Sequence, residues 1–271
     1  QVRQVFDALK SQGPVQTYRA VMKKLDSYSP LGYTCAGEVI AVGAGVTEFK
    51  VDDLVACAGA GYANHAEVVA VPVNLCVKVA DTVNLKHAAY NSLGAISMQG
   101  VRQADLRVGE VCVVIGLGLL GQLACMILKA SGAHVIGVDV VQSSVDHAIA
   151  NGIVDYGFSR SASSLEEKIE AASYGIGADA VIVAAATSST DPINFAGAIV
   201  RKKGKVVVLG AVPTGFERDP HWYRKELELR MACSYGPGRY DPEYEEKGVD
   251  YPFAYVRWTE KRNMEAFQRL I

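Results

Sequence analysis

The spacing of hydrophobic residues changes along the chain, and each change predicts a different kind of structure. From Val2 to Leu25 apolar residues recur every three or four positions, which predicts an amphipathic segment split into two helices at Gly13-Pro14. Short runs rich in β-branched residues follow, with turn signals between them, and they predict the strands of a small β-barrel-like unit. These predicted strands are residues 36–42, 54–57, 66–71 and 75–79.

The second half of the chain has another rhythm, in which fully apolar runs alternate with helical patterns. A helix is predicted first from Leu85 to Leu106, with a break at Gly94. Continuous apolar strands alternating with helices predict a parallel sheet that is covered on both faces. The strands are residues 111–115, 134–138, 178–184 and 205–209, and the helices are residues 119–130, 143–150 and 191–200. The tail after Ser234 is rich in Tyr, Gly and Pro, and we expect it to return to the first unit.

Composition and charge narrow the classes of partner. Half of the 271 residues are hydrophobic and 21% are charged, which predicts a packed core. The net charge is −2 without a basic block, and no apolar run approaches the ~20 residues of a membrane helix, so we expect a small-molecule substrate and neither nucleic acid nor membrane. The chain has no secretory signal and no initiator Met, which suggests a processed or truncated piece.

The cysteines are expected to be free thiols. None belongs to a C-x-x-C pair, and most lie within apolar stretches, which favours buried thiols in a reducing compartment over a disulfide or zinc framework. This predicts a cytoplasmic protein. The six residues are Cys35, Cys57, Cys76, Cys112, Cys125 and Cys233.

A glycine-rich loop follows directly after the first predicted parallel strand. In such a loop Gly116 permits the tight turn, Gly118 lets the backbone approach a pyrophosphate, and Gly121 lets the next helix pack on the strand. The helix that begins at Leu119 and Leu120 would present free N–H groups to the phosphates. This predicts the dinucleotide-binding loop of a Rossmann fold, whereas the Gly-Lys-Ser/Thr ending of a nucleoside-triphosphate P-loop is absent.

Asp139 ends the next predicted strand, eighteen residues after Gly121, at the spacing of an acid that binds the adenosine ribose. A carboxylate there would repel a 2′-phosphate by on the order of 4 kcal/mol at ~4 Å, so NAD(H) is favoured over NADP(H). The alternative is that Asp139 only caps the following helix. Further cofactor contacts are expected from Val140 and from Thr187 and Gly210, which follow later strands at the same sheet edge.

With these residues in place, the chain resembles the medium-chain dehydrogenase/reductase superfamily of zinc alcohol dehydrogenases and quinone oxidoreductases. Residues 32–39 and 42–50 resemble its catalytic-domain signature without a gap. More narrowly, residues 30–33, 71–76 and 234–242 resemble the dehydrogenase half of bacterial bi-domain oxidoreductases. The resemblance implies a fragment without the N-terminal strands, a homo-oligomer (dimer or tetramer), and a fusion to or pairing with a second oxidoreductase domain as an open alternative.

The departures from that signature concern zinc. Tyr33 stands where the zinc alcohol dehydrogenases have a metal-binding His, and Asn91 stands where they have a downstream Cys ligand. A phenol and an amide are poor substitutes for imidazole and thiolate. The four-cysteine lobe that carries their structural zinc is also missing after Cys57. The resemblance therefore implies a site without any metal ligand, as in the quinone oxidoreductases.

Three residues are candidates for the chemistry of a zinc-free hydride transfer. The hydroxyl of Tyr33 can donate and accept, although a tyrosine packed at a domain hinge is the alternative. Histidine is the residue type suited to proton relay, but an exposed or capping loop histidine is the favoured interpretation of His65. Asn91 would line the pocket as an amide. Arg239 and Arg257 could meet an anionic substrate such as a nucleotide sugar, or form solvated ion pairs.

Together these features predict an α/β fold, a Rossmann doubly wound parallel sheet plus a partial GroES-like β-rich catalytic domain. The expected division is 1–28 helical segment, 29–94 catalytic domain, 95–236 Rossmann domain and 237–271 return to the catalytic domain. The predicted function is that of a zinc-independent NAD(H)-dependent oxidoreductase for an alcohol or carbonyl compound, sugar-linked substrates included, or for an enone. A non-catalytic dinucleotide-binding subunit or sensor is the alternative. An S-adenosylmethionine-dependent methyltransferase is disfavoured by the three-glycine spacing and by the attached β unit.

Overall fold

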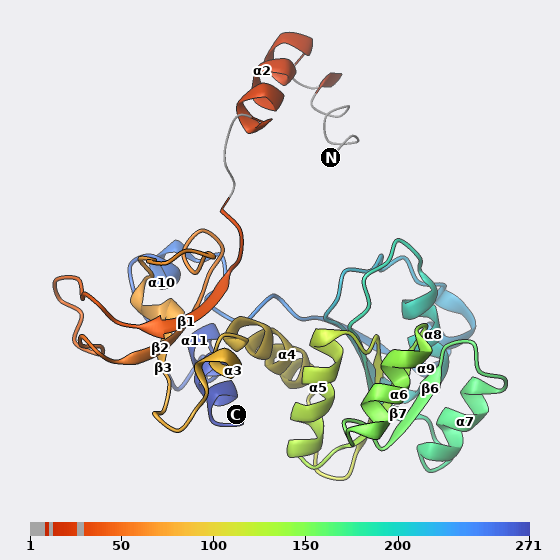
Figure 1. The fold of residues 1–271 in the computed structure, drawn as a ribbon. Helices are drawn as coiled ribbons and strands as arrows, with labels where there is room; N and C mark the ends of the chain where they lie inside the picture. Colours follow the sequence, from red (N-terminus) through yellow and green to blue (C-terminus); the bar gives the residue numbers. More distant parts are fainter. Residues whose placement is uncertain (1–8, 11–12, 26–29) are drawn as a thin grey trace.

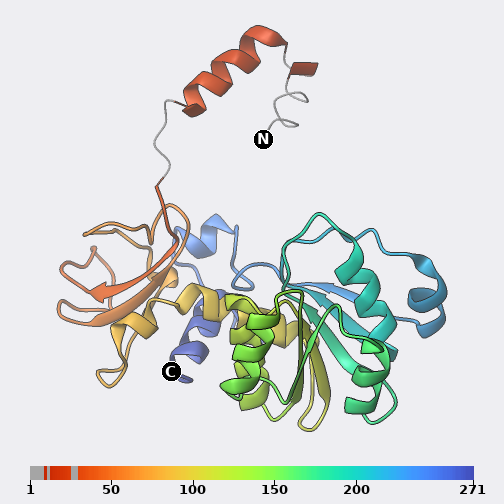
Figure 2. The same ribbon diagram turned by 45° about the vertical axis from the view of Figure 1, so that its right-hand side comes forward.

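The computed structural model describes residues 9–10, 13–25 and 30–271. These residues form one part built on a three-stranded sheet and another built on a six-stranded sheet (Figures 1 and 2). Helix α2 (Pro14–Leu25) lies away from both parts and is the described portion of the predicted N-terminal helical segment. Most of the predicted helix before Gly13, and residues 26–28, lie outside the described residues.

The larger sheet is parallel throughout, with the strand order β6-β5-β4-β7-β8-β9. The chain runs outward from β4 to β6 and then crosses back to β7 on the other side of β4, so the switch point lies between β4 and β7. This confirms the predicted doubly wound sheet. Its strands are β4 (Val111–Ile115), β5 (His134–Asp139), β6 (Tyr156–Ser159), β7 (Ala178–Val183), β8 (Val200–Val208) and β9 (Glu228–Met231).

Both faces of this sheet are covered, because side chains of a strand point alternately to its two faces. Val113 packs in one apolar cluster with Ile193 and Phe195 of α8, whereas its neighbour Val114 packs in a second cluster with Leu128 of α5. The helices around the sheet are α5 (Leu119–Ala130), α6 (Gln142–Ala150), α7 (Leu165–Ala172), α8 (Asp191–Ile199), the short α9 (Tyr223–Lys225) and the turn η2 (Arg218–Trp222).

The smaller sheet is antiparallel, with the order β1-β2-β3. Its strands are β1 (Thr34–Glu38), β2 (Leu54–Ala58) and β3 (Cys76–Lys78), the last preceded by the turn η1 (Val73–Leu75). The strand predicted at residues 66–71 is wrong, and the one predicted at 36–42 is shifted toward the N-terminus. Residues 66–71 are mostly exposed and pair with no described strand, so their β-branched residues have no neighbour against which a strand could form.

Helix α4 joins the two parts. The predicted helix 85–106 is divided into α3 (Leu85–Ala88) and α4 (Asn91–Ala104), but the break does not fall at Gly94. Gly94 lies inside α4, where the ring of Phe267 takes the space of a side chain, since a Cβ there would come within 2.3 Å of it. The predicted domain boundary between residues 94 and 95 consequently falls within a continuous helix.

The tail packs on the smaller sheet and on α4. It carries α10 (Pro242–Glu245) and α11 (Glu260–Gln268), and α11 lies against α4. Tyr235 and Met264 from this tail share one buried cluster with Ala56 of β2 and Val77 of β3. Segments about 180 residues apart in sequence therefore build one core, which supports the residues that enter the site from β1 and α4.

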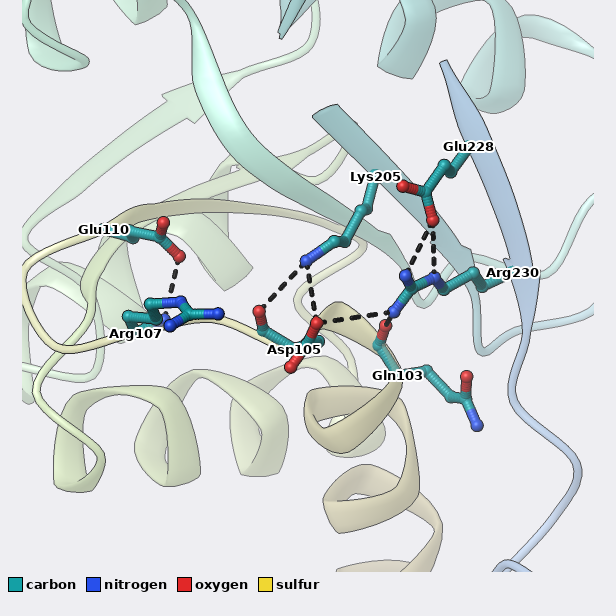
Figure 3. A network of polar contacts seen from close by, with 7 residues as sticks. All are labelled: Gln103, Asp105, Arg107, Glu110, Lys205, Glu228 and Arg230. Carbon is teal, nitrogen blue, oxygen red and sulfur yellow. Dashed lines mark hydrogen bonds and ion pairs between the residues drawn. The ribbon is translucent and has the colours of Figure 1, made fainter. Parts of the chain in front are cut away.

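Polar contacts hold the end of α4 to the amino edge of the large sheet (Figure 3). Asp105, in a left-handed conformation with φ 49°, accepts from Lys205 Nζ at 3.0 Å. Arg230 on β9 donates to the carbonyl of Gln103 at 3.0 Å and pairs with Glu228 at 2.7 Å. These contacts lie at the opposite edge from the glycine loop, so they orient α4 without taking part in that loop.

Candidate cofactor site and active site

The glycine loop turns between β4 and α5, and two of its glycines are required by packing. Gly116 has a φ of 100°, and a Cβ on it would lie 2.8 Å from the backbone nitrogen of Ala185. A Cβ on Gly121 would lie 1.8 Å from the carbonyl oxygen of Gly116, so no side chain fits there. Gly118 differs, because a Cβ on it would meet nothing within 4 Å. The loop is therefore closed on its protein side and open at Gly118.

The open side of the loop carries hydrogen-bond donors. Gly118 is the N-cap residue of α5 and supplies no side-chain cap. The N–H groups of Leu119, Leu120 and Gly121 belong to the first helical turn and have no partner within the helix. Together with the positive end of the helix dipole, these groups suit a phosphate. The residues at this loop thus fit the diphosphate of a dinucleotide.

Asp139 faces this loop from the end of β5, the strand next to β4. Its Oδ2 accepts the N–H of Leu117 at 2.6 Å, and its Oδ1 accepts the N–H of Val141 at 2.7 Å. Val140, directly after it, has 78% of its surface exposed. The carboxylate therefore lies beside the glycine loop at the sheet edge, where the ribose of a bound dinucleotide could reach it.

Thr187 and Gly210 lie on the loops after β7 and β8, at the same edge, but their N–H groups are already used within the protein. The N–H of Thr187 donates to the carbonyl of Ala211 at 3.0 Å, and that of Gly210 to the carbonyl of Val183 at 2.8 Å. A Cβ on Gly210 would lie 2.1 Å from the carbonyl oxygen of Ala185. Gly210 thus lets two loops pack closely, and the hydroxyl of Thr187 accepts the N–H of Ser189 at 3.2 Å, so it keeps only its donor for a ligand.

Tyr33 and His65 occupy one corner of the smaller part. Tyr33 immediately precedes β1, has 40% of its surface exposed, and accepts the N–H of Gly59 with its carbonyl at 3.0 Å. The N–H of His65 donates to the carbonyl of Leu31 at 2.7 Å, and the imidazole lies on Gly32, where a Cβ would come within 2.2 Å of the ring. The imidazole therefore lies against the main chain that directly precedes Tyr33.

Asn91 begins α4 and is completely buried. Its Oδ1 accepts from Gln268 Nε2 at 2.8 Å, while its Nδ2 has no hydrogen-bond partner among the described residues. The amide oxygen is therefore engaged by α11, and an amide nitrogen is not a metal ligand. With a phenol at Tyr33, this donor set does not fit a zinc ion.

Two serines of α4 connect the corner of Tyr33 with the glycine loop. Ser92 Oγ donates to the carbonyl of Tyr33 at 3.1 Å, and Ser97 Oγ donates to the carbonyl of Leu120 at 3.0 Å. Thr34 reinforces the first contact, since its hydroxyl donates to the carbonyl of Ala89 at 2.7 Å and accepts the N–H of Ser92. The sequence interpretation missed these residues, although small polar residues on a buried helix face were a signal.

The two arginines that were candidates for binding an anionic substrate contact other residues of the protein. Arg239 forms an ion pair with Glu245 at 2.5 Å and lies over the ring of Tyr240. Arg257 is exposed, with its guanidinium 3.8 Å from the ring centroid of Trp258. Neither is brought next to the glycine loop or to Tyr33 by a contact in the structure, and the charge of Arg239 is compensated by Glu245.

The described residues contain neither a side-chain cluster suited to a metal ion nor a helix suited to a membrane. Within residues 9–10, 13–25 and 30–271, His, Cys, Asp and Glu side chains form no group of three or more that could hold a metal ion. Over the same ranges, none of the helices has the length and apolar character needed to cross a membrane.

Comparison with known proteins places this geometry in a family. The sequence profile of the family described as zinc-binding dehydrogenase matches residues 120–247. The chain is 29% identical over 252 residues to D-guloside 3-dehydrogenase of Shigella flexneri and 28% identical over 243 residues to a probable D-xylulose reductase A of Aspergillus clavatus. The solved structure of galactitol-1-phosphate dehydrogenase from Escherichia coli matches with a TM-score of 0.68 at 15% identity. The chain belongs to the medium-chain dehydrogenase/reductase superfamily.

The matches cover a larger fraction of this chain than of the proteins that it matches. The alignment with the guloside dehydrogenase covers 89% of this chain and 65% of the relative, and that with the xylulose reductase covers 78% and 67%. The galactitol-1-phosphate dehydrogenase structure is matched over 90% of this chain and 74% of that one. The chain therefore spans just under two thirds of the guloside dehydrogenase. The predicted membership of the medium-chain dehydrogenase/reductase superfamily, and the fold that it implied, are confirmed.

Proposed function

We propose that the chain is the dehydrogenase part of a zinc-independent, NAD(H)-dependent oxidoreductase that moves a hydride between nicotinamide and an alcohol or carbonyl carbon. One observation carries the proposal: the carboxylate of Asp139 turns to the N–H of Leu117, beside the open position at Gly118. A diphosphate on the N-terminus of α5 and a ribose on Asp139 would fix a dinucleotide along the sheet edge. Bound nicotinamide supplies or takes up the hydride.

The charge of Asp139 supports NAD(H) over NADP(H). Its oxygens already accept two N–H groups, from Leu117 and Val141, which hold the carboxylate in place without cancelling its charge. A 2′-phosphate brought beside it would meet a like charge, and even a third of ~4 kcal/mol corresponds to about tenfold in affinity. Two ribose hydroxyls would instead find a hydrogen-bond acceptor.

The proposed substrate class is a polyol or a sugar-linked alcohol and the corresponding carbonyl compound. The relatives named above act, by their names, on a guloside, on xylulose and on galactitol 1-phosphate. The position of Tyr33 agrees with such a substrate, since its partly exposed hydroxyl can donate to a carbonyl oxygen or accept from an alcohol. An enone substrate remains the second form of the same hydride chemistry.

Without a zinc ion, the developing oxyanion must be stabilised by hydrogen-bond donors. We assign this role to the hydroxyl of Tyr33, and proton relay to the neighbouring His65. Asn91 contributes its Nδ2, which has no hydrogen-bond partner among the described residues and is held in place by the bond between its Oδ1 and Gln268. The proposed division into a catalytic domain (29–94 with 237–271) and a Rossmann domain (95–236) puts these residues and the glycine loop on the two sides of one cleft.

The assembled protein is proposed to be a dimer or tetramer in the cytoplasm, in line with the resemblance and with six free cysteines. A second oxidoreductase domain, fused or separate, is part of the same expectation. Light scattering of the purified protein measures the first point, because a monomer at micromolar concentration would contradict it.

The decisive experiment is a binding and turnover series on the purified protein. NADH fluorescence titration is expected to give at least tenfold tighter binding than NADPH, and a panel of polyols and ketoses is expected to include a substrate oxidised or reduced with change in absorbance at the nicotinamide band. Binding of NADH without turnover of any panel member would favour the sensor alternative. Thermal stabilisation by S-adenosylmethionine and not by NADH would overturn the oxidoreductase assignment.

A further inference from the structure

Three of the six cysteines lie side by side across the small sheet. Cys35 on β1 is the register partner of Cys57 on β2, and Cys57 is the register partner of Cys76 on β3. Side chains of register partners point to the same face of a sheet, so the three thiols form a row. Cys57 and Cys76 belong to one buried cluster with Val55 and Ala63, and Cys35 packs against it. We call Cys35, Cys57 and Cys76 the thiol row.

The two pairs in the thiol row differ in backbone geometry. The N–H of Val79 donates to the carbonyl of Leu54, which makes residues 54 and 79 a hydrogen-bonded pair. Pairs alternate along an antiparallel ladder, so Cys57 and Cys76 form a non-hydrogen-bonded pair, with Cα atoms ~4.5 Å apart. Their Sγ atoms lie 3.6 Å apart. This backbone spacing lies within the range of disulfides, and only a small side-chain movement would join the sulfurs.

Cys35 and Cys57 form the wider kind of pair. The N–H of Gly59 donates to the carbonyl of Tyr33, so alternation makes Cys35 and Cys57 a hydrogen-bonded pair with Cα atoms ~5.5 Å apart. A bond between them is possible, but Cys57 and Cys76 are the closer pair. The thiol row therefore has one preferred end product.

Access and acidity separate the three thiols. Cys57 and Cys76 have only 5% and 9% of their surface exposed, whereas Cys35 is half-buried and reachable from solvent. The thiol of Cys57 donates to Cys35, which lowers the pKa of Cys35 to about 7 against the opposing effect of burial. When the single proton of Cys57 points to Cys76 instead, it lowers the pKa of Cys76, with burial opposing this effect and the charge of Lys261 adding to it. Thiolates are the reactive form in such chemistry.

We propose that the thiol row is a site of reversible oxidation by a hydroperoxide, with Cys35 as the entry thiol and a disulfide between Cys57 and Cys76 as the product. The Cys35 thiolate attacks the terminal peroxide oxygen, breaks the O–O bond and becomes a sulfenic acid, and the other oxygen leaves, after protonation, as an alcohol or, when the oxidant is hydrogen peroxide, as water. The Cys57 thiol displaces the hydroxyl group, which gives a Cys35–Cys57 disulfide and water.

The last step is a thiol–disulfide exchange. The Cys76 thiolate attacks the sulfur of Cys57, and Cys35 leaves as a thiolate. In total, two thiols lose two hydrogen atoms and one hydroperoxide is reduced, so that with hydrogen peroxide two waters form. The reaction needs neither a dinucleotide nor the substrate of the proposed oxidoreductase, and it stands or falls independently of that function.

The positions of lysine and arginine in the sequence allow the two possible disulfides to be told apart after digestion with trypsin. No Lys or Arg lies between Lys50 and Lys78, so trypsin leaves Cys57 and Cys76 in one peptide, residues 51–78, and Cys35 in the preceding peptide, residues 25–50. The full chain is treated with hydrogen peroxide, alkylated, digested and analysed by mass spectrometry. We expect peptide 51–78 to be two hydrogen atoms lighter and unalkylated, to return to the dithiol with dithiothreitol, and peptide 25–50 to stay alkylatable.

Two other results would overturn the proposal in the wild-type protein, without any variant. One is alkylation of both cysteines in peptide 51–78 after peroxide treatment. The other is oxidation of the cysteines to sulfinic or sulfonic acids with no disulfide, which would show that no resolving thiol reaches the first oxidised sulfur.

Cysteine variants show in which order the three thiols react. Cys35→Ser is expected to form the Cys57–Cys76 disulfide on the order of tenfold more slowly, because the accessible thiolate is lost. Cys76→Ser is expected to stop at a disulfide joining peptides 25–50 and 51–78. Cys233→Ser removes the exposed cysteine outside the row and is expected to oxidise at the wild-type rate. An unchanged rate in Cys35→Ser would remove Cys35 from the site.

Discussion

The carboxylate of Asp139 accepts the main-chain N–H of Leu117 at 2.6 Å, and so joins the end of β5 to the turn after β4. One side chain thereby does two things: it holds the glycine loop in shape, and it keeps a negative charge next to the loop's free donors. This arrangement makes the cofactor part of the site the most directly testable.

Replacement of Asp139 by asparagine keeps the shape of the side chain and removes its charge. We expect the NADH Kd of Asp139→Asn to rise about tenfold or more, because a hydrogen bond to a charged group is worth roughly 1.5–3 kcal/mol. The NADPH Kd should fall or stay level, so the preference of the protein for NADH over NADPH becomes smaller. Fluorescence titration measures both. Asp146→Asn, an exposed site on α6, is the matched control, and an unchanged NADH Kd in Asp139→Asn would contradict the ribose-binding role.

Replacement of two glycines of one loop by alanine should affect two different properties, the stability of the fold in one case and the affinity for NADH in the other. Gly121→Ala places a Cβ against the carbonyl oxygen of Gly116, so we expect a marked loss of stability, seen as a lower Tm. Gly118→Ala adds a methyl group in open space at a φ of −69°, so its Tm should stay near wild type. Its NADH affinity should nevertheless fall, since the methyl group would occupy the approach to the phosphates. Wild-type NADH affinity in Gly118→Ala would show that the phosphates lie elsewhere.

Removal of the Tyr33 hydroxyl tests the proposed oxyanion donor. Tyr33→Phe keeps the ring at the start of β1, and we expect kcat to fall by about 10²-fold with little change in NADH affinity or Tm. Steady-state kinetics with the best panel substrate measure this. Tyr255→Phe, at a position 88% exposed in the tail, is the control and should behave as wild type. A loss of less than twofold in Tyr33→Phe would leave the hydroxyl outside the reaction.

Metal removal distinguishes a zinc-dependent enzyme from the proposed one. The side chains of Tyr33 and Asn91 do not suit zinc, so dialysis against a strong chelator is expected to leave turnover within about 20% of its initial value. Elemental analysis of the dialysed protein checks that zinc is gone. A parallel loss of zinc and turnover, restored by added zinc, would contradict the proposed mechanism.

Glu260 should make stability depend on pH. It is completely buried at the start of α11, neither of its oxygens has a hydrogen-bond partner among the described residues, and burial raises its pKa from 4.5 to about 8, with Glu245 adding to the effect and Arg239 opposing it. The folded protein then keeps a proton that the unfolded chain releases above about pH 4.5. Stability present below pH 4.5 is therefore lost progressively as the pH rises to about 8.

The variant Glu260→Gln cannot release that proton. We expect it to equal wild type near pH 4.5 and to exceed it at pH 8 by on the order of a few kcal/mol, as measured by urea unfolding. Glu167→Gln, exposed on α7, should show the wild-type profile. Parallel pH profiles for wild type and Glu260→Gln would show that Glu260 is not the group responsible.

The central elements of the large sheet could be predicted from sequence because their signal is local. Strand β4 is fully apolar, and β5 and β7 each have a buried apolar stretch, so both faces of these strands are covered. Helices α5 and α8 follow β4 and β7 with clear helical spacing. The outer strands β6 and β9 were not predicted, since Tyr156–Ser159 and Glu228–Met231 are short, contain polar residues and are only partly buried. The helix α7, with only Leu165 and Ile169 buried, was missed for the same reason.

The residues of the candidate site likewise divide into those that sequence spacing predicted and those that it did not. The positions of Gly116, Gly118, Gly121 and Asp139 follow from spacing along the chain, and the structure brings them together. By contrast, the contact between Ser92 and Tyr33 joins residues 59 positions apart, and no local pattern encodes it. The break at Gly94 was wrong because the ring that fills its missing side chain, Phe267, comes from the far end of the sequence.

Helix α4 also restricts how a protein of this design can vary. Ser92 and Ser97 are five residues apart, which puts their hydroxyls ~7.5 Å apart along the axis and about 140° apart around it. Insertion or deletion of one residue between them would rotate one hydroxyl by about 100° from its carbonyl. We therefore expect that stretch to keep a constant length in related proteins, and insertions to be confined to the loops that flank the helix.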